Sequence, residues 1–215
     1  MKYKYAFFDF DGTVADTKRG IMNSAKQALQ QFGITTDEET LRSFVGPTLW
    51  HSFETLFGFD YEKQNEAVDF YREYYTEKGM YEAEIYPGMK ELLANLKAKG
   101  IKLGIASAKN EICVIDSCKH YGVYDMFDVI AGSFENGDRS SKDELIAYLM
   151  EQMGLKDISE CVFVGDSHTD FNGANALGMD FIAALYDRDS SEFEGLECEY
   201  YANTVQDIGN IILGA

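Results

Sequence analysis

From Gly88 onward, short apolar segments alternate with segments of helical periodicity. The apolar segments, which we expect to be strands, cover residues 101–106, 128–131, 161–164 and 181–185. Apolar residues recur at helical spacing in the intervening stretches, at about 89–96, 111–121, 145–153 and 205–212. Alternation of this kind requires crossover connections, which are right-handed and make neighbouring strands parallel. The sequence therefore predicts an α/β fold, a parallel sheet core with helices on both faces.

A long stretch before this alternating region shows only helical patterns. Helical spacing runs from Ile21 to Phe32, and further helical pieces are expected at 49–57 and 62–78. No strand is evident between Val14 and Tyr86. We therefore expect residues 1–14 and 87–215 to form the α/β core domain and residues 15–86 to form a small all-helical domain inserted after the first strand.

The first apolar segment ends in two carboxylates. Phe7 and Phe8 lead into Asp9 and Asp11, and a Gly-Thr turn follows. On an extended chain, residues two apart project to the same side, and the carboxyl end of a parallel strand faces the crevice where α/β sheets place ligands. Carboxylates so close repel each other, so the pair predicts a divalent cation, a shared proton or both. A solvated acidic turn is the alternative.

Three later segments end in residues that suit the same chemistry. Ser107 and Ala108 stand where a strand is expected to pass into a helix, a position that binds phosphate or simply caps the helix. Lys142 opens another helix, where a cation opposes the macrodipole, so it is either functional or an exposed surface lysine. Asp166 and Asp170 follow the strand at 161–164 and suit an oxygen-ligand site for Mg²⁺, or an ordinary capped helix.

Composition excludes several classes of partner. The formal net charge is -18, from 37 acidic and 19 basic residues, so the surface should repel nucleic acid and anionic membranes. The 4 cysteines form no CxxC motif and are expected to be reduced thiols. No signal-peptide pattern is evident and no apolar run approaches the ~20 residues that span a bilayer, so we expect a cytoplasmic protein. Nothing in the sequence indicates its oligomeric state.

Taken in order, the motifs resemble the haloacid dehalogenase-like hydrolase superfamily. The matching residues span the chain, and they are Asp9-Phe10-Asp11-Gly12-Thr13, Ser107, Lys142 and Gly165-Asp166 with Asp170. The helical insertion resembles the cap of the subgroup that includes phosphoglycolate phosphatase and β-phosphoglucomutase. The resemblance implies a Rossmann-like core, a small phosphorylated metabolite as substrate and Mg²⁺ as cofactor.

The same resemblance implies a role for each matching residue. Asp9 would be the nucleophile that forms an aspartyl-phosphate, and Asp11 the general acid and base. Asp9, Asp11 (through its backbone carbonyl), Asp166 and Asp170 would hold Mg²⁺. The phosphate-binding residues would be Ser107, Ala108 and Lys142.

Within the superfamily, two positions favour a phosphatase. Asp11 argues against the dehalogenases and the phosphonate-cleaving members, which lack this aspartate. The sugar phosphomutases with this cap carry a histidine close to the position of Ile21, and its absence here favours a phosphatase. The main prediction is a Mg²⁺-dependent phosphohydrolase similar to phosphoglycolate phosphatase. The alternatives are a phosphomutase of the β-phosphoglucomutase type, an inorganic pyrophosphatase and a non-catalytic regulatory protein.

Other polar residues carry weaker signals. In the helical insertion, the candidate contacts for a substrate anion are Arg42, His51, Lys63 and Arg72, although each also fits a solvated surface position. His168 lies inside the acidic motif and is expected to be a turn residue rather than a metal ligand.

Overall fold

The computed structural model describes residues 2–134, 139 and 141–214, which form two compact units. One unit comprises Met1–Ala15 and Ile85–Ala215, and the other comprises Asp16–Glu84. The borders expected from the sequence, 14/15 and 86/87, differ from these by one or two residues. Each unit is described by itself below.

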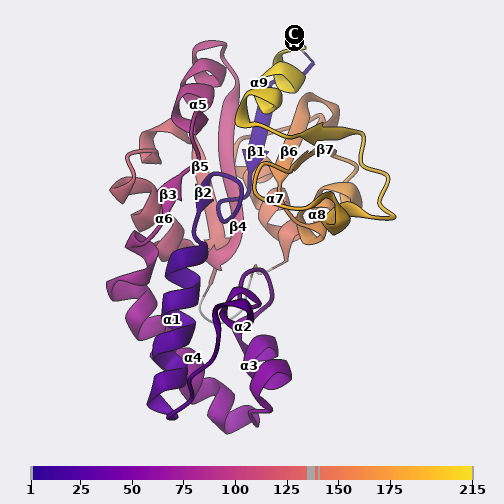
Figure 1. The fold of residues 1–215 in the computed structure, drawn as a ribbon. Helices are drawn as coiled ribbons and strands as arrows, with labels where there is room; N and C mark the ends of the chain where they lie inside the picture. Colours follow the sequence, from indigo (N-terminus) through magenta and orange to yellow (C-terminus); the bar gives the residue numbers. More distant parts are fainter. Residues whose placement is uncertain (1, 135–138, 140, 215) are drawn as a thin grey trace. The chain divides into compact units, whose positions relative to one another are not determined.

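The first unit is built on a six-stranded sheet (Figure 1). Its order is β5-β4-β1-β6-β7-β8, and each neighbouring pair is parallel. The strands are β1 (Tyr5–Phe8), β4 (Lys102–Asn110), β5 (Val129–Ser133), β6 (Cys161–Gly165), β7 (Asp180–Ala184) and β8 (Tyr200–Ala202). The predicted parallel α/β core is confirmed.

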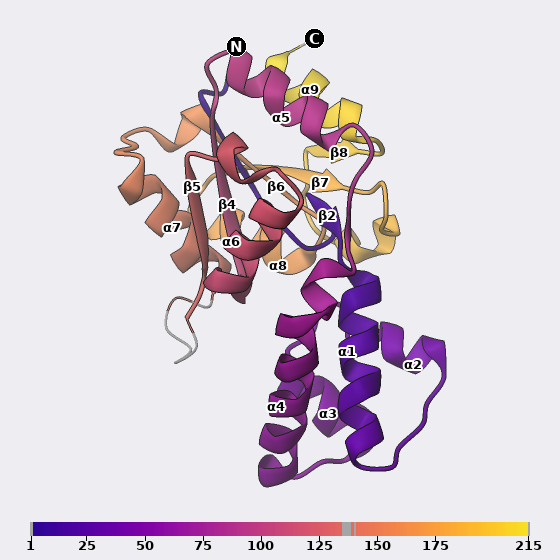
Figure 2. The same ribbon diagram turned by 90° about the vertical axis from the view of Figure 1, so that its left-hand side faces the viewer.

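Helices cover both faces of this sheet, as Figure 2 shows for α5, α6 and α9 on one of them. On that face lie α5 (Met89–Ala98), α6 (Glu111–His120) and α9 (Val205–Leu213), and on the other lie α7 (Lys142–Gln152) and α8 (His168–Ala176). Side chains of β1 alternate between the two apolar clusters: Phe8 packs with α5 and α6, and Phe7 packs with α7 and α8. Burial on both faces explains why the central strands β1 and β6 read as continuous apolar runs.

Short 3₁₀ helices complete this unit and its neighbour. They are η1 (Gly79–Tyr81), η2 (Tyr124–Met126), η3 (Ile158–Glu160) and η4 (Ser190–Phe193). None of the helices in the described part of the chain is both long and apolar enough to cross a membrane.

The second unit is helical. It contains α1 (Lys18–Gln31), α2 (Glu38–Arg42), α3 (Leu49–Phe57) and α4 (Tyr61–Glu77). Aromatic rings fill its interior, with Phe53 stacked on Phe59 at 5.7 Å between ring centroids. Tyr71 and Tyr75 of α4 are buried and stack on each other at 5.6 Å, so these tyrosines serve packing.

Two expectations about strands were wrong. The segment from Val14 to Tyr86 does contain strands, because β2 (Ala15–Asp16) and β3 (Glu84–Ile85) form a two-stranded sheet. Strands of two residues are too short to show alternation. The edge strand β8 was not expected either, because only Ala202 of its three residues is buried.

Candidate active site

The candidate site lies at the carboxyl ends of β1 and β6. These strands are parallel neighbours, and the chain continues from them to opposite halves of the sheet, which is the position where α/β sheets open a crevice. Asp9 directly follows β1, and its backbone N–H donates to the Val164 carbonyl at 2.9 Å. Asp166 directly follows β6. The sheet register therefore brings these two aspartates together.

Lys142 joins the aspartates from the helix side. It is the first residue of α7, and its Nζ lies 2.8 Å from Asp9 Oδ1, 2.8 Å from Asp170 Oδ1 and 2.9 Å from the Ala106 carbonyl oxygen. The side chain is 7% exposed. Of the two alternatives considered from the sequence, an exposed surface lysine is therefore excluded. Two buried carboxylates offset the unfavourable position of a cation at a helix N-terminus.

Asp170 serves two partners at once. Its Oδ2 accepts from the backbone N–H of Ser167 at 3.1 Å and from its hydroxyl at 2.7 Å, which closes a capping box at the start of α8. Its Oδ1 is buried and faces Lys142 in an ion pair, without the geometry of a hydrogen bond. The capping box thus holds the carboxylate in place and leaves Oδ1 directed toward the other charged groups.

Three carboxylates of the site can share a cation. Asp9, Asp166 and Asp170 each offer an oxygen, and these oxygens all lie within 4.8 Å of one another. All three side chains are buried. A buried group of carboxylate oxygens without sulfur or imidazole suits a hard divalent cation such as Mg²⁺. The residues present therefore fit the metal that the sequence predicts.

Burial and mutual repulsion perturb the pKa values in this group. Burial, reinforced by the Asp170, Asp166 and Asp11 carboxylates, raises the pKa of Asp9 to about 7, although the Lys142 ammonium opposes the shift. Burial and Asp170 raise the pKa of Asp166 to about 6. For Lys142, burial lowers the pKa, but the Asp170 and Asp9 carboxylates outweigh it, and the net pKa is raised. The lysine is therefore charged at neutral pH.

The Asp11 carboxylate pairs with Lys109 rather than with Lys142. The chain leaves the extended conformation after β1, because Gly12 adopts φ +78° and the Val14 N–H donates to the Phe10 carbonyl. The Asp11 carboxylate lies 2.5 Å from Lys109 Nζ, outside the group of three carboxylates that could share a cation. Asp9 and Asp11 thus face different lysines, and a shared proton between them gains no support from this geometry.

Ser107 is not a helix cap. Strand β4 continues past Ala106 to Asn110, and the Asn110 side chain caps α6 by accepting from the N–H groups of Ile112 and Cys113. The capping alternative for Ser107 is wrong, because pairing of β4 with β5 extends to Asn110 and Ser133. The Ser107 side chain is buried, and its hydroxyl accepts from the Lys109 N–H at 3.4 Å. Ala108 follows it on the same strand.

Two glycines leave space for side chains of the site. A Cβ on Gly12 would lie 2.2 Å from Asp166 Oδ2, and its positive φ already disfavours other residues. A Cβ on Gly173 of α8 would lie 2.6 Å from the Lys142 Cβ. Glycine at these positions lets Asp166 and Lys142 approach the neighbouring backbone.

Comparison with known proteins agrees with this geometry. A family model described as haloacid dehalogenase-like hydrolase matches residues 6–184. The chain belongs to this family. The predicted resemblance is thereby confirmed, and so is the prediction of an enzyme of the phosphatase class at the level of the family.

Relatives of this hydrolase include named phosphatases. It is 35% identical over 187 residues to a 5'-nucleotidase of Pseudomonas aeruginosa, which covers 86% of this chain and 84% of that protein. It is 27% identical over 178 residues to a phosphoglycolate phosphatase of Neisseria meningitidis, covering 80% and 75%. The crystal structure of a putative phosphatase from Clostridium difficile superposes with a TM-score of 0.92 at 36% identity, covering 99% of each chain.

The sequence did not point to one further charged residue of this hydrolase, Arg188. Its Nε donates to Asp166 Oδ2 at 2.6 Å, and burial of Asp166 in this pair is nearly complete, with 3% of the side chain exposed. Arg188 lies between β7 and η4 in an acidic segment without periodicity, so no local pattern marked it. Lys109, two residues after Ser107 on β4, is paired with Asp11.

His168 does not join the carboxylates of the hydrolase. It is the first residue of α8, its side chain is 59% exposed, and its Nδ1 lies 2.7 Å from Glu192 Oε1. The group of residues that can hold a metal does not include it. The turn position expected for it from the sequence is wrong, because the capping box of Ser167 and Asp170 starts α8 at His168.

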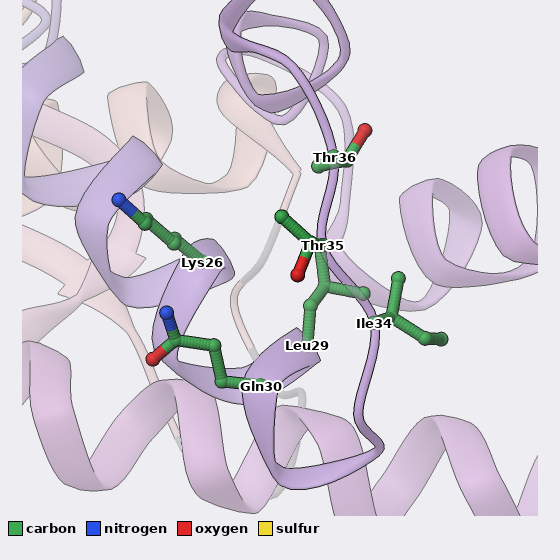
Figure 3. Close-up of a pocket in the computed structure, with 6 residues that line it drawn as sticks. All are labelled: Lys26, Leu29, Gln30, Ile34, Thr35 and Thr36. Carbon is green, nitrogen blue, oxygen red and sulfur yellow. The ribbon is translucent and has the colours of Figure 1, made fainter.

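Three candidate substrate contacts of the helical unit have partners within that unit. Arg42 lies 3.7 Å from Glu38, Lys63 lies 4.0 Å from the centre of the Phe59 ring, and Arg72 lies 5.4 Å from the Trp50 ring. A small pocket of this unit, shown in Figure 3, is lined by residues of α1 and the segment that follows it, from Lys26 to Thr36. None of the predicted catalytic, metal or phosphate residues lines that pocket.

Proposed function

We propose that this protein is a Mg²⁺-dependent phosphatase that hydrolyses a small phosphorylated metabolite through an aspartyl-phosphate on Asp9. The observation that carries the proposal is the buried group of Asp9, Asp166 and Asp170 around Lys142. In this arrangement Asp9, the Asp11 carbonyl, Asp166 and Asp170 would hold Mg²⁺. When bound, the metal supplies positive charge that neutralises the oxygens of the transferring phosphoryl group.

Asp9 is suited to act as the nucleophile. The Lys142 ammonium at 2.8 Å favours its carboxylate form against the effect of burial. In the first step an Asp9 oxygen attacks phosphorus, an oxygen–phosphorus bond forms, and the bond from phosphorus to the ester oxygen breaks. The leaving oxygen takes a proton from Asp11.

The second step returns the enzyme to its starting state. Asp11, now a carboxylate, accepts a proton from water, and the water oxygen attacks the phosphorus of the aspartyl-phosphate. The bond from phosphorus to Asp9 breaks, and inorganic phosphate leaves. Lys109, 2.5 Å from Asp11, holds that carboxylate at the edge of the site. Ser107, Ala108 and Lys142 are proposed to bind the phosphoryl oxygens through hydroxyl, backbone and ammonium donors.

The local charge balance favours a phosphate dianion in spite of the charge of -18 on the whole chain. Four carboxylates of the site face three cations, which leaves one negative charge when all are ionised. These groups are Asp9, Asp11, Asp166 and Asp170 with Lys109, Lys142 and Arg188. A divalent cation reverses the sign of the site and allows a dianion to approach.

Phosphate release from a panel of small phosphoesters tests the proposal. The panel contains phosphoglycolate, nucleoside 5'-monophosphates, sugar phosphates and pyrophosphate, each with Mg²⁺ and with EDTA. We expect metal-dependent release concentrated on one class of compound. Release that is equally fast in EDTA, or none from any compound by the folded protein, would contradict the proposal.

Substitutions at the two catalytic aspartates test the roles within the reaction. Asp9→Asn should abolish turnover, and Asp11→Asn should slow it by roughly 10²- to 10⁴-fold, the usual effect of losing a general acid. Asp157→Asn is the matched control, because it removes a carboxylate just before η3, at the amino end of β6. Turnover near the wild-type rate in Asp9→Asn would exclude the aspartyl-phosphate.

A further inference from the structure

The segment that follows β7 contacts the site at three points. In Figure 1 this segment leaves β7 and turns back beside α8. The Tyr186 hydroxyl donates to the Thr13 carbonyl, Arg188 Nε donates to Asp166 Oδ2, and Glu192 Oε1 accepts from the His168 N–H at 3.0 Å. These partners belong to the turn after β1, the end of β6 and the start of α8, which are three elements that form the site.

The segment is anchored at both ends. Tyr186 packs edge-on against Tyr86 with 4.8 Å between ring centroids, and the Tyr86 hydroxyl contacts Asp187. Phe193, at the end of η4, is 2% exposed and packs against Phe181 of β7 at 5.9 Å. Packing of the aromatic rings on either side fixes the intervening backbone, so the position of Arg188 is set by these contacts as well as by the ion pair.

The Asp166 carboxylate is confined by two neighbours. The absence of a side chain on Gly12 makes room for it, since a Cβ there would lie 2.2 Å from Oδ2 and 3.0 Å from Oδ1. Arg188 Nε holds Oδ2 from a distance of 2.6 Å. A charge-assisted hydrogen bond to a nearly buried carboxylate restricts rotation of that carboxylate. Oδ1 is then the oxygen that remains for a cation.

We propose that Arg188 is a positioning residue for the metal site, which orients Asp166 by holding Oδ2 so that Oδ1 is presented to Mg²⁺. This inference rests on the Mg²⁺ site of the proposed function. Groups that orient a metal ligand from behind raise its affinity for the metal, and their loss typically weakens binding about 10- to 100-fold. Arg188 is also a cation close to the metal, and its charge by itself would weaken Mg²⁺ binding. The two effects have opposite signs, so an affinity measurement separates them.

Isothermal titration calorimetry with Mg²⁺ alone tests the inference, on wild type, Arg188→Met and Arg188→Lys. We expect Arg188→Met to bind Mg²⁺ about 10- to 100-fold more weakly. Arg188→Lys keeps the charge but loses the fixed guanidinium geometry, so its affinity should fall between wild type and Arg188→Met.

A matched control removes a similar ion pair elsewhere. Lys2 Nζ lies 2.6 Å from Asp180 Oδ2 at the amino end of β7, so Lys2→Met removes one positive charge while leaving the site intact. Its Mg²⁺ affinity should match that of wild type. Thermal melting followed by circular dichroism in EDTA establishes whether each variant is folded. If Arg188→Met is unfolded, the comparison of wild type with Arg188→Lys tests the inference.

The outcomes separate this inference from the proposed function. Absence of Mg²⁺ binding by wild type would overturn the metal site itself, and with it both proposals. Binding by wild type that is unchanged or tighter in Arg188→Met would overturn only the positioning role and identify Arg188 as a charge-balancing residue. Wild-type affinity in Arg188→Lys would also overturn that role, because the fixed geometry of the guanidinium would then not be needed.

Discussion

Replacing Lys142 by methionine should destabilise the α/β unit far more than the loss of one ion pair usually does. Methionine keeps the length and the apolar stem of lysine but removes the ammonium. Lys142 Nζ lies 2.8 Å from both Asp9 Oδ1 and Asp170 Oδ1, and the three side chains are 7%, 11% and 1% exposed. Without the ammonium, two buried carboxylates lose their counter-charge.

The expected magnitude follows from this burial. Removing one partner of a buried ion pair costs about 3–5 kcal/mol, because the remaining charge is left uncompensated. For a protein of this size, each kcal/mol corresponds to roughly 2–4 °C in Tm. We therefore expect Lys142→Met to melt roughly 6–20 °C below wild type at pH 8 in EDTA.

The assay is thermal and urea unfolding, followed by far-ultraviolet circular dichroism. Lys4→Met is the control, because Lys4 Nζ lies only 2.5 Å from Glu160 Oε1, but the two side chains are 66% and 33% exposed. Exposed pairs contribute little to stability, so this variant should melt with wild type. The same loss of stability in both variants would refute the reasoning, since contact distance rather than burial would then determine the energy.

A second arm of the experiment uses pH. Carboxylates whose pKa is raised in the folded protein bind protons on folding, so their cost falls as the pH is lowered through that pKa. The gap between Lys142→Met and wild type should therefore narrow from pH 8 to pH 6. A gap that is constant with pH would show that the loss comes from packing.

Three other predictions concern the metal, a glycine and the thiols. The pKa values of Asp9 and Asp166 are about 7 and about 6 without metal, so Mg²⁺ binding should release protons and weaken as the pH falls from 8 to 6. Titration calorimetry in two buffers of different ionisation enthalpy measures the protons released. Identical binding heats in both buffers would contradict this prediction. Gly12→Ala should weaken Mg²⁺ binding, because the new Cβ would displace Asp166. Gly33, with φ +69° and open space around it, provides the control. Gly33→Ala should lower the free energy of unfolding by roughly 1–2 kcal/mol, the cost of a left-handed backbone, and leave Mg²⁺ affinity unchanged. Burial raises the pKa of Cys118 and Cys161 to about 12. A disulfide reagent at pH 8 should therefore label these thiols only after urea unfolds the chain. Rapid labelling of the folded protein would disprove their burial.

The sequence predicts the core of the site because the rules of parallel sheets act on it directly. Asp9 and Asp166 each follow an apolar strand, and the carboxyl ends of parallel neighbours meet at one edge. Lys142 is the first residue of α7 and Asp170 lies in the first turn of α8, and both helices pack on the same face of the sheet. Strand and helix order alone thus brings Asp9, Lys142 and the segment from Asp166 to Asp170 together, although other elements separate them in the sequence.

The features that escaped prediction depend on contacts between distant segments. Arg188 is positioned by aromatic anchors at Tyr186 and Phe193, and neither local periodicity nor a motif encodes that placement. Strand β4 continues beyond its apolar run because β5 pairs with it as far as Asn110, so Asn110 rather than Ser107 caps α6. Both cases are tertiary effects that override local preference.

The central place of β1 determines when this enzyme can become active during its synthesis. Tyr5 pairs with Lys102 on one side and with Cys161 on the other, so the first strand to leave the ribosome gains its neighbours late. Until β6 emerges, Asp9 has no Asp166 beside it, and one edge of β1 stays unpaired. Unpaired strand edges on a nascent chain are prone to aggregation, so the interval between the synthesis of β1 and that of β6 is a period of risk for this protein.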